Sequence, residues 1–441
     1  MLRYTERAVK VFLNTGTRFP RKVIWAMGLI KYSAARANTE LGLLDKIMGE
    51  AISKASLELA EGLHDDKVIV DVFQTGSATG LNMNINEVIA LRASELCNCE
   101  VHPNDHVNLC QSTNDVVTSA IRIAALADIR ESLEPSLNEF MNSLKELIIK
   151  TENVAKPGRT HLRDALPITM ALEFKAFLDA LKHDLEIMNS VKEYIMELPL
   201  GGTAVGTGIN SHPDFPQLVI KSLRELTKID LRLSDVKTRG MRLLSDLVML
   251  SSSLRVLALD IMRLCQDLRL MYSGPETGLN EIDIPQEVPG SSIMPGKENP
   301  VTVEAAMLAA TQVMGLDYSN NLVGMLGEFE LSMGIPLITF NIHTQISLLS
   351  EAMRKLSQHV LRRIEPNIKR SRELAERSQA LITILTPLVG YDKATLLTKK
   401  LKEGKKLIDV LKELGLSDDV ISEFKDLNKL LKPGMLVKKS H

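Results

Sequence analysis

Cysteine is scarce in this sequence, and long apolar runs are missing from it. The 441 residues include 4 cysteines, too few for a disulfide scaffold. Cys97 and Cys99 form a C-x-C pair with no paired Cys or His motif nearby, so we expect small buried or surface thiols rather than a zinc site. No apolar run reaches the ~18 residues of a membrane-spanning helix, and residues 1–7 lack a signal core. The sequence therefore predicts a cytoplasmic protein without membrane contact.

An excess of charge of either sign is also missing. The chain has 53 Lys and Arg residues against 55 Asp and Glu residues, a formal net charge of −2. A general binder of nucleic acid would need a basic excess, so we expect no nucleic-acid partner and only local anion sites. Hydrophobic residues make up 45% of the chain, enough for a large core, and at ~150 residues per domain the length suggests about three domains.

Aromatic residues make up only 4% of the sequence, and proline is absent from long stretches. Abundant Met, Leu, Ile and Ala favour helices over sheets. Proline-free stretches are where long helices can run, because proline removes a helical hydrogen bond and clashes with the preceding turn. We expect long helices around residues 110–150, 160–196, 240–272, 300–320 and 340–365.

The segment 240–272 is apolar nearly all round. Leu247, Leu254, Leu264 and similar residues recur at spacings of three and four, with further apolar residues between them. Such a helix is buried among other helices, of its own or of other subunits. We therefore predict an all-α fold with a central bundle of long helices that is completed by oligomerisation. A monomeric helical protein is the alternative.

The composition changes along the chain and predicts three consecutive domains. Residues 1–109 form the expected N-terminal domain, and residues 110–365 the central long-helix domain. After Pro366 the sequence is richer in Lys and Glu, with breaks at several glycines. Residues 366–441 are therefore expected to form a small helical C-terminal domain.

Polar segments at the ends of the apolar runs are candidates for chemistry. They are rich in Gly, Ser, Thr, Asn and His and comprise residues 75–87, 102–108, 111–115, 158–165 and 289–300. Helix N-termini that open with such residues offer free N–H groups to an anion. Simple helix capping and tight turns are the alternative interpretation of each segment taken alone.

The segment 289–300 is the most informative of these. Two glycines and three prolines make it a loop, placed ahead of a helix expected from about Val301, where it could fold over a ligand. Lys297 supplies a charge for a carboxylate, and Ser291 and Ser292 offer hydroxyls that could act as a base. In 158–165, His161 is suited to proton transfer near neutral pH. A mobile surface loop and a structural histidine are the plainer alternatives.

The motifs resemble those of the fumarase/aspartase superfamily. Residues 290–300 read G-S-S-I-M-P-G-K-E-N-P, similar to its signature loop. Residues 75–87 resemble T-G-S-G-T…N-M-N-x-N-E, 102–108 resemble H-P-N-D-x-V-N, 158–164 resemble G-R-T-H-L-Q-D, and 200–208 resemble L-G-G-T-A-V-G-T-G. The resemblance covers nearly the whole chain and, within the superfamily, is strongest to class II fumarate hydratases.

This resemblance implies a fold and a reaction. The fold is a three-domain α-helical subunit whose long helices form a core of about 20 helices in a homotetramer, with segments of three subunits meeting at each site. The reaction is reversible anti elimination on a four-carbon dicarboxylate, through an aci-carboxylate carbanion that fixed donors and a cation stabilise. Hydration of fumarate to L-malate, a step of the tricarboxylic acid cycle, is the implied activity. The resemblance implies neither a metal nor an organic cofactor.

The resemblance also implies roles for individual residues. Ser291 is similar to the base that removes the Cβ proton, His161 to the residue that assists the leaving group, and Glu304 to the carboxylate that orients this histidine. The implied substrate contacts are Ser77, Thr79, Ser112, Thr113, Asn114, Thr160, Ser292, Lys297 and Asn299. A second, peripheral dicarboxylate site is implied at His102, Asn104 and Asp105.

Some residues depart from the fumarase pattern. Ala78 replaces the usual Gly, and Glu298 stands where an apolar or small polar residue is common. The triplet Ser112-Thr113-Asn114 and the run 278–282 are similar to the corresponding segments of aspartate ammonia-lyases. Conversion of L-aspartate to fumarate and ammonia is therefore the alternative function. A non-catalytic structural member of the superfamily is a remote alternative. Such a protein could lose its base, its cation and its histidine, whereas Ser291, Lys297 and His161 are all present here.

Overall fold

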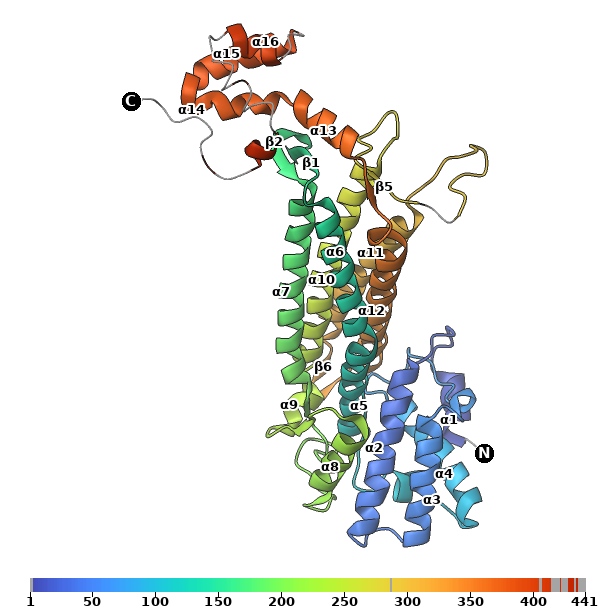
Figure 1. Ribbon diagram of the computed structural model, residues 1–441. Helices are drawn as coiled ribbons and strands as arrows, with labels where there is room; N and C mark the ends of the chain where they lie inside the picture. Colours follow the sequence, from blue (N-terminus) through green and yellow to red (C-terminus); the bar gives the residue numbers. More distant parts are fainter. Residues whose placement is uncertain are drawn as a thin grey trace. The chain divides into compact units, whose positions relative to one another are not determined.

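The computed structural model describes residues 3–285, 288–403, 407–413, 421, 427–431 and 434, and these residues are mostly helical (Figure 1). The chain divides into two compact units. The first contains residues 1–137, 183–261 and 308–352, and the second contains residues 138–182, 262–307 and 353–441. The expected all-α fold is confirmed. The division into three consecutive domains stays a prediction.

The first unit begins with a cluster of helices. They are α1 (Arg3–Val11), α2 (Arg21–Glu40), α3 (Lys46–Ala60), η1 (Asp65–Lys67), α4 (Thr79–Cys97), η2 (Pro103–Val107), α5 (Thr113–Asp128) and η3 (Ile129–Leu133). Helices α2 and α3 lie side by side (Figure 1). Their contact depends on Gly28, because a Cβ there would lie 2.8 Å from the carbonyl oxygen of Ser56. Asp45 caps α3 by accepting from the amides of Ile47 and Met48, which satisfies two free donors of its first turn.

Long helices carry the apolar pattern of the sequence. They are α6 (Glu134–Thr151), α7 (Met170–Ile195), α10 (Ser245–Tyr272), α11 (Val301–Val323) and α12 (Ile335–Leu356). Shorter elements of the first unit are β3 (Glu197–Leu198), α8 (Phe215–Thr227), β4 (Arg232–Leu233), α9 (Lys237–Arg242), β6 (Gly327–Glu328) and β7 (Leu331–Ser332), where β3 pairs with β4 and β6 with β7. The expected helices near 240–272 and 300–320 are thus present.

The apolar face of α10 is already buried within one chain. Leu247 and Leu254 are 0% exposed and Leu264 is 1% exposed. From the apolar pattern we also expected these residues to be exposed to water in a monomer, and that expectation is wrong. Apolar side chains that one chain leaves exposed lie elsewhere on the long helices, for example Leu308 and Tyr318 of α11, at 73% and 70%.

The second unit contains a β-hairpin where the sequence predicted the start of a helix. Strands β1 (Ala155–Thr160) and β2 (Arg163–Thr169) pair antiparallel. His161 and Leu162 form the turn between them, with φ of 54° and 57°, as a two-residue hairpin turn requires. The long helix expected over 160–196 therefore begins only at Met170, and His161 lies at a hairpin tip rather than at a helix start.

The rest of the second unit follows α10 and α12. Strand β5 (Ile282–Asp283) pairs antiparallel with β8 (Glu365–Pro366). The other described elements are η4 (Ser357–Leu361), α13 (Ile368–Arg377), η5 (Gln379–Leu385), α14 (Thr386–Val389), α15 (Tyr391–Lys402), α16 (Leu407–Glu413) and α18 (Leu427–Leu430). The helices predicted after Pro366 are therefore present among the described residues.

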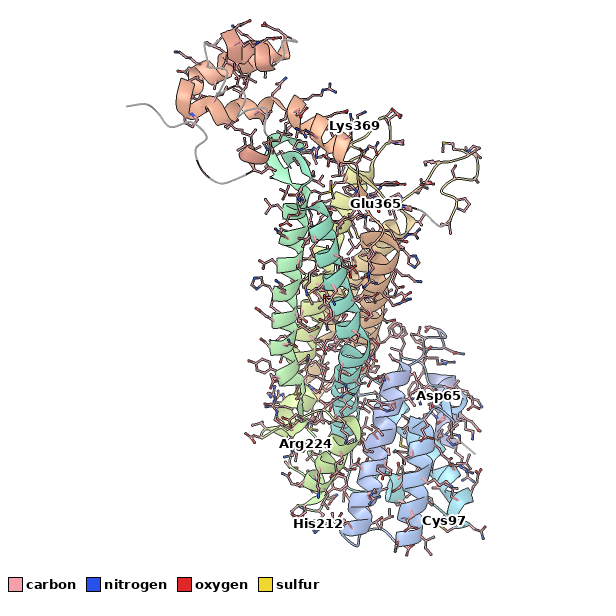
Figure 2. All side chains as sticks on the ribbon, in the orientation of Figure 1. Asp65, Cys97, His212, Arg224, Glu365 and Lys369 are labelled. Atoms are coloured by element: carbon pink, nitrogen blue, oxygen red, sulfur yellow. A yellow bond between two sulfur atoms is a disulfide. The ribbon has the colours of Figure 1, made fainter. Side chains whose placement is uncertain are left out.

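The cysteines differ from the prediction. Cys97, at the end of α4 (Figure 2), and Cys99 are joined in a disulfide, so they are not the free thiols that we expected. A separation of two residues brings the Cα atoms within 5.2 Å, inside the range that a disulfide needs. Cys110 and Cys265 are free and buried. Within the described ranges, no helix is both long and apolar enough to cross a membrane.

Candidate active site

Ser291 lies in the loop before α11, and this loop folds back on itself. The Ser291 Oγ accepts hydrogen bonds from the backbone amides of Ile293 and Met294, at 3.3 and 3.0 Å. The Asn299 side-chain amide donates to the carbonyl of Gly290 at 2.5 Å. These hydrogen bonds hold the Ser291 hydroxyl in a fixed position, with two N–H groups pointing at its oxygen.

Gly290 makes this loop geometry possible. A Cβ at this position would lie 2.5 Å from the carbonyl oxygen of Lys297 and 2.6 Å from the amide nitrogen of Asn299. Only glycine at this position lets the two ends of the loop approach each other so closely. Val301 begins α11 directly after the loop, as the sequence predicted, so the loop is tied to a rigid helix at its C-terminal end.

A pocket of about 650 Å³ in the second unit contains several of the predicted residues. Lys297, Asn299 and Glu304 line it. Residues that sequence reasoning missed also line it, namely Leu162, Arg263, Gln266, Asp267, Arg269, Leu270, Tyr272, Ser273, Gly274, Glu298 and Pro300. A signal for part of this set was available, because polar residues at 263, 266, 267 and 269 interrupt the apolar pattern at one end of α10.

Charges of both signs lie in this pocket. The Arg269 guanidinium lies 3.6 Å from a carboxylate oxygen of Glu304, and both side chains are about half exposed. The resemblance implied that Glu304 orients His161, but within one described chain its ion pair is with Arg269. The Tyr272 hydroxyl donates to the Glu298 carbonyl at 3.5 Å, and burial raises the pKa of Tyr272. Lys297 itself is exposed and so is available to a ligand.

The hairpin that carries Thr160 and His161 is anchored at its base. Both residues are exposed near the tip, whereas Glu281 is fully buried and forms ion pairs with Lys156 at 3.1 Å and Arg159 at 2.9 Å. Lys156 also donates to Glu173 at 2.7 Å, whose pKa is raised by burial. Buried ion pairs therefore hold the base of the hairpin, while its tip is exposed.

The first unit brings three polar segments of the sequence together. The Asn108 carboxamide oxygen accepts from Lys31 at 2.8 Å and from Asn82 and Asn86 at 3.2 Å each. Asn82 also donates to the Thr113 hydroxyl at 3.1 Å. The segments 75–87, 102–108 and 111–115 therefore share one network, although the sequence offered only their composition.

Ser112 caps α5, which is the alternative interpretation that the sequence left open for this segment. Its Oγ accepts from the Asn114 amide at 3.3 Å, and its own amide donates to Asp115 at 2.9 Å. Asp115 also accepts from the amides of Gly201 and Thr203, at 3.1 and 3.0 Å. Burial raises the pKa of Asp115 to about 6, although these hydrogen bonds oppose the shift. The cap therefore gives the Asn114 amide, one of the N–H groups at the start of α5, a hydrogen-bond acceptor.

The remaining predicted residues lie near helix starts or on the surface. Ser77 and Thr79 share a hydrogen bond at 2.8 Å, and Ala78 between them has φ of 63°, a conformation that explains the glycine of the resembling motif. In the other segments, Ser292, His102, Asn104 and Asp105 are exposed. The ring nitrogen Nδ1 of His102 accepts from the Asp105 amide at 3.1 Å, so the segment 102–105 forms an exposed turn.

Comparison with known proteins identifies the family. A family model described as "Lyase" matches residues 2–315. The chain is 53% identical to a class II fumarate hydratase of Saccharolobus solfataricus, over 99% of this chain and 100% of that relative, and 40% identical to one of Xylella fastidiosa, over 98% and 90%. A class II fumarase of Schistosoma mansoni has a similar structure, with a TM-score of 0.94 and 33% identity over 97% of this chain and 95% of that one. The chain therefore belongs to the lyase family, and within it to the class II fumarate hydratases.

Proposed function

We propose that this chain catalyses the reversible hydration of fumarate to L-malate. The observation that carries the proposal is the loop before α11, in which two backbone amides point at the Ser291 hydroxyl oxygen and Lys297 and Asn299 line the adjoining pocket. A hydroxyl with a stabilised alkoxide beside a cation is suited to removing a proton next to a carboxylate.

In the direction from L-malate, Ser291 takes a Cβ proton. The electron pair of the broken C–H bond moves into the adjacent carboxylate and forms the aci-carboxylate. Lys297 and Asn299 stabilise this doubly negative group, because the charge on it is largest at this point. The electron pair held in the aci-carboxylate then returns to form the Cα=Cβ double bond of fumarate while the Cα–O bond breaks, and a proton delivered with the help of His161 converts the departing hydroxide into water. Glu304 is proposed to position His161.

The other predicted residues are proposed to hold the substrate. Their side chains carry hydroxyl, amide or cationic groups, which suits a dicarboxylate; they are Ser77, Thr79, Ser112, Thr113, Asn114, Thr160, Ser292, Lys297 and Asn299. His102, Asn104 and Asp105 are proposed to form a separate peripheral site, which their exposure makes accessible.

We further propose that the active form is a homotetramer with shared sites. The exposed apolar side chains of Leu308 and Tyr318 on α11 and Leu172 on α7 support this proposal. Apolar surface of this kind on long helices favours association. Oligomeric assembly would also bring together site residues from different chains.

The test is to supply L-malate, L-aspartate or buffer to the purified protein and to follow the ultraviolet absorbance of the conjugated fumarate double bond. Fumarate from L-malate alone supports the proposal. Fumarate from L-aspartate alone would make the protein an aspartate ammonia-lyase, as the triplet Ser112-Thr113-Asn114 suggested. Fumarate from neither substrate would contradict catalysis and favour a structural role.

A further inference from the structure

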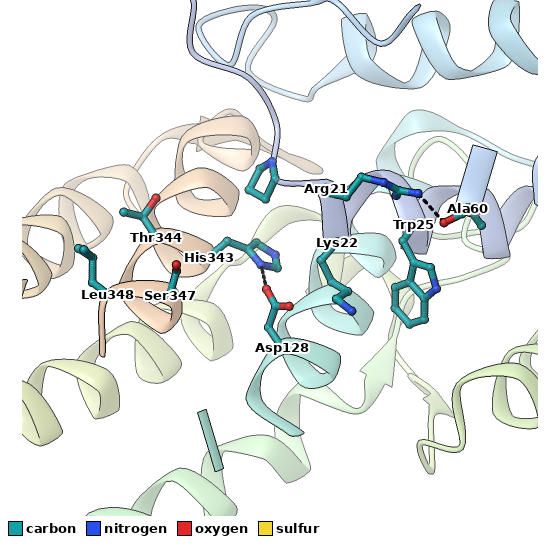
Figure 3. Close-up of a pocket in the computed structure, with 10 residues that line it drawn as sticks. Arg21, Lys22, Trp25, Ala60, Asp128, His343, Thr344, Ser347 and Leu348 are labelled. Carbon is teal, nitrogen blue, oxygen red and sulfur yellow. Dashed lines mark hydrogen bonds and ion pairs between the residues drawn. The ribbon is translucent and has the colours of Figure 1, made fainter. Parts of the chain in front are cut away.

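A second cavity lies in the first unit and shares no residue with the proposed active site (Figure 3). Its volume is about 660 Å³, within the range of small-molecule sites. It is formed by the start of α2, the end of α3, the end of α5 and one face of α12. The residues that matter to its chemistry are Arg21, Lys22, Trp25, Asp128 and His343.

A histidine–aspartate pair lies on one side of this cavity. His343 is 4% exposed, and its Nδ1 lies 2.6 Å from a carboxylate oxygen of Asp128. The carboxylate accepts a hydrogen bond from the Nδ1–H group, and this bond fixes the orientation of the ring. The other ring nitrogen, Nε2, is buried and has no hydrogen-bond partner among the described residues. A buried nitrogen without a partner is costly, which indicates that a ligand group completes the site.

The start of α2 lies on another side of the cavity. Pro20 is its N-cap residue and provides no side-chain hydrogen bond, and the first turn contains no acidic residue. The first turn instead begins with Arg21 and Lys22, whose positive charges are unfavourable at the positive end of a helix dipole. An anion bound at this end would satisfy the free N–H groups and offset the charge.

Acidic neighbours neutralise these two cations only in part. Arg21 pairs with Asp65 at 2.7 Å, yet its Nη1 is buried without a partner in the described part of the chain. Lys22 pairs with Glu131 at 2.7 Å and lies 5.0 Å from the ring centroid of Trp25. One guanidinium nitrogen and the remaining ammonium protons are thus left for a ligand.

We propose that this cavity binds a small organic oxyanion, a phosphate or carboxylate with a planar apolar part. The oxyanion lies against the first turn of α2, Arg21, Lys22 and His343 Nε2. The apolar part lies against Trp25, which lines the same cavity beside Lys22 (Figure 3). The inference does not depend on the proposed hydratase activity.

The Nε2 atom can donate to an anion only when the ring carries both protons, because the Nδ1–H group donates to Asp128. The other charged groups of the cavity are Arg21 and Lys22 of α2, whose acidic partners are Asp65 of η1 and Glu131 of η3.

The chain offers a specific reporter for this cavity, because Trp25 is its one tryptophan. We would titrate the protein with inorganic phosphate, phenyl phosphate and benzoate and follow Trp25 fluorescence. A saturable change is expected, with phenyl phosphate or benzoate binding more tightly than phosphate. Whether phenyl phosphate or benzoate binds more tightly identifies the oxyanion as phosphate or carboxylate. Absence of a saturable change with all three probes would overturn the proposal.

Variants assign the change to the site. Lys22→Met should weaken binding at least fivefold, and His343→Gln should also weaken it. Lys46→Met is the matched control, because Lys46 also begins a helix but Asp45 caps that helix, so binding should be unchanged. Lys22 is partly exposed and its replacement should fold even if the buried histidine variant does not. Unchanged binding in Lys22→Met would overturn the proposal.

Discussion

Ser291 is the residue on which the proposed chemistry depends most directly. Its hydroxyl acts only on the way to the carbanion, so Ser291→Ala should lower kcat by ~10³-fold or more and leave substrate affinity nearly unchanged. The measurements are steady-state kinetics and equilibrium binding of L-malate. Ser190→Ala is the control, since the Ser190 hydroxyl donates to the Glu186 carbonyl within α7 and has no part in the proposed scheme. Near-normal turnover of Ser291→Ala would exclude Ser291 as the base.

Lys297 should affect binding as well as catalysis. Its ammonium would contact a carboxylate in the ground state and face more charge in the aci-carboxylate, so Lys297→Met should raise KM and lower kcat. Steady-state kinetics in both directions measure the two effects. An unchanged KM would mean that Lys297 points away from the substrate.

Lys31 should make stability depend on pH. Burial lowers its pKa from 10.5 to about 7 in the folded protein, with the charge of Asp115 opposing the shift. Between these values the unfolded chain binds the proton more strongly, so the contribution of Lys31 to the free energy of unfolding rises as pH increases, by up to ~1.4 kcal/mol per pH unit.

Urea unfolding at several pH values from about 7 to about 9 tests this contribution. Lys31→Met should flatten the rise relative to the wild type, and the exposed Lys46→Met should not. An equal slope in Lys31→Met and the wild type would show that the buried amine stays charged.

At the scale of elements, the long helices were predictable and the hairpin was not. Helices α10 and α11 follow from apolar spacing and proline placement, which are local properties. The hairpin of β1 and β2 turns at His161 and Leu162, where neither glycine nor asparagine marks the turn. Its conformation is held by partners that are distant in the sequence, such as Glu281. Local composition does not predict ion pairs between residues so far apart in the chain.

Glu281 should stabilise this hairpin strongly. Glu281→Gln would leave Lys156, which is 2% exposed, with less compensation for its buried charge, and removal of one partner of a buried pair costs ~3–5 kcal/mol. Urea unfolding measures the loss. Glu365→Gln is the control, because Glu365 pairs with Lys150 at 2.6 Å but is 64% exposed, and exposed pairs contribute ~0–1 kcal/mol. Equal losses would contradict the anchoring role.

At the scale of the whole molecule, assembly of the sites between subunits can be tested by mixing. His161→Asn and Ser291→Ala should each be nearly inactive. If each site takes these residues from different chains, subunit exchange between the two variants should restore part of the activity, because some mixed sites would be intact. No recovery after demonstrated exchange would place both residues of a site on one chain.

The sequence predicted which segments carry chemistry better than it predicted their partners. The loop before α11 and the cap of α5 lie where the motifs indicated. The network around Asn108 joins residues of α2, α4 and α5. Such contacts arise from packing between segments far apart in the chain, so local pattern could not predict them. The same holds for burial of Leu247 within a single chain.

The order in which the chain contributes to its two compact units limits how the protein can be divided. The chain passes from one unit to the other at residues 137, 182, 261, 307 and 352. Each unit is built from three segments that alternate along the chain, so no single proteolytic cut or truncation separates one whole unit from the other. Neither unit can therefore be expressed by itself as one uninterrupted stretch of this sequence.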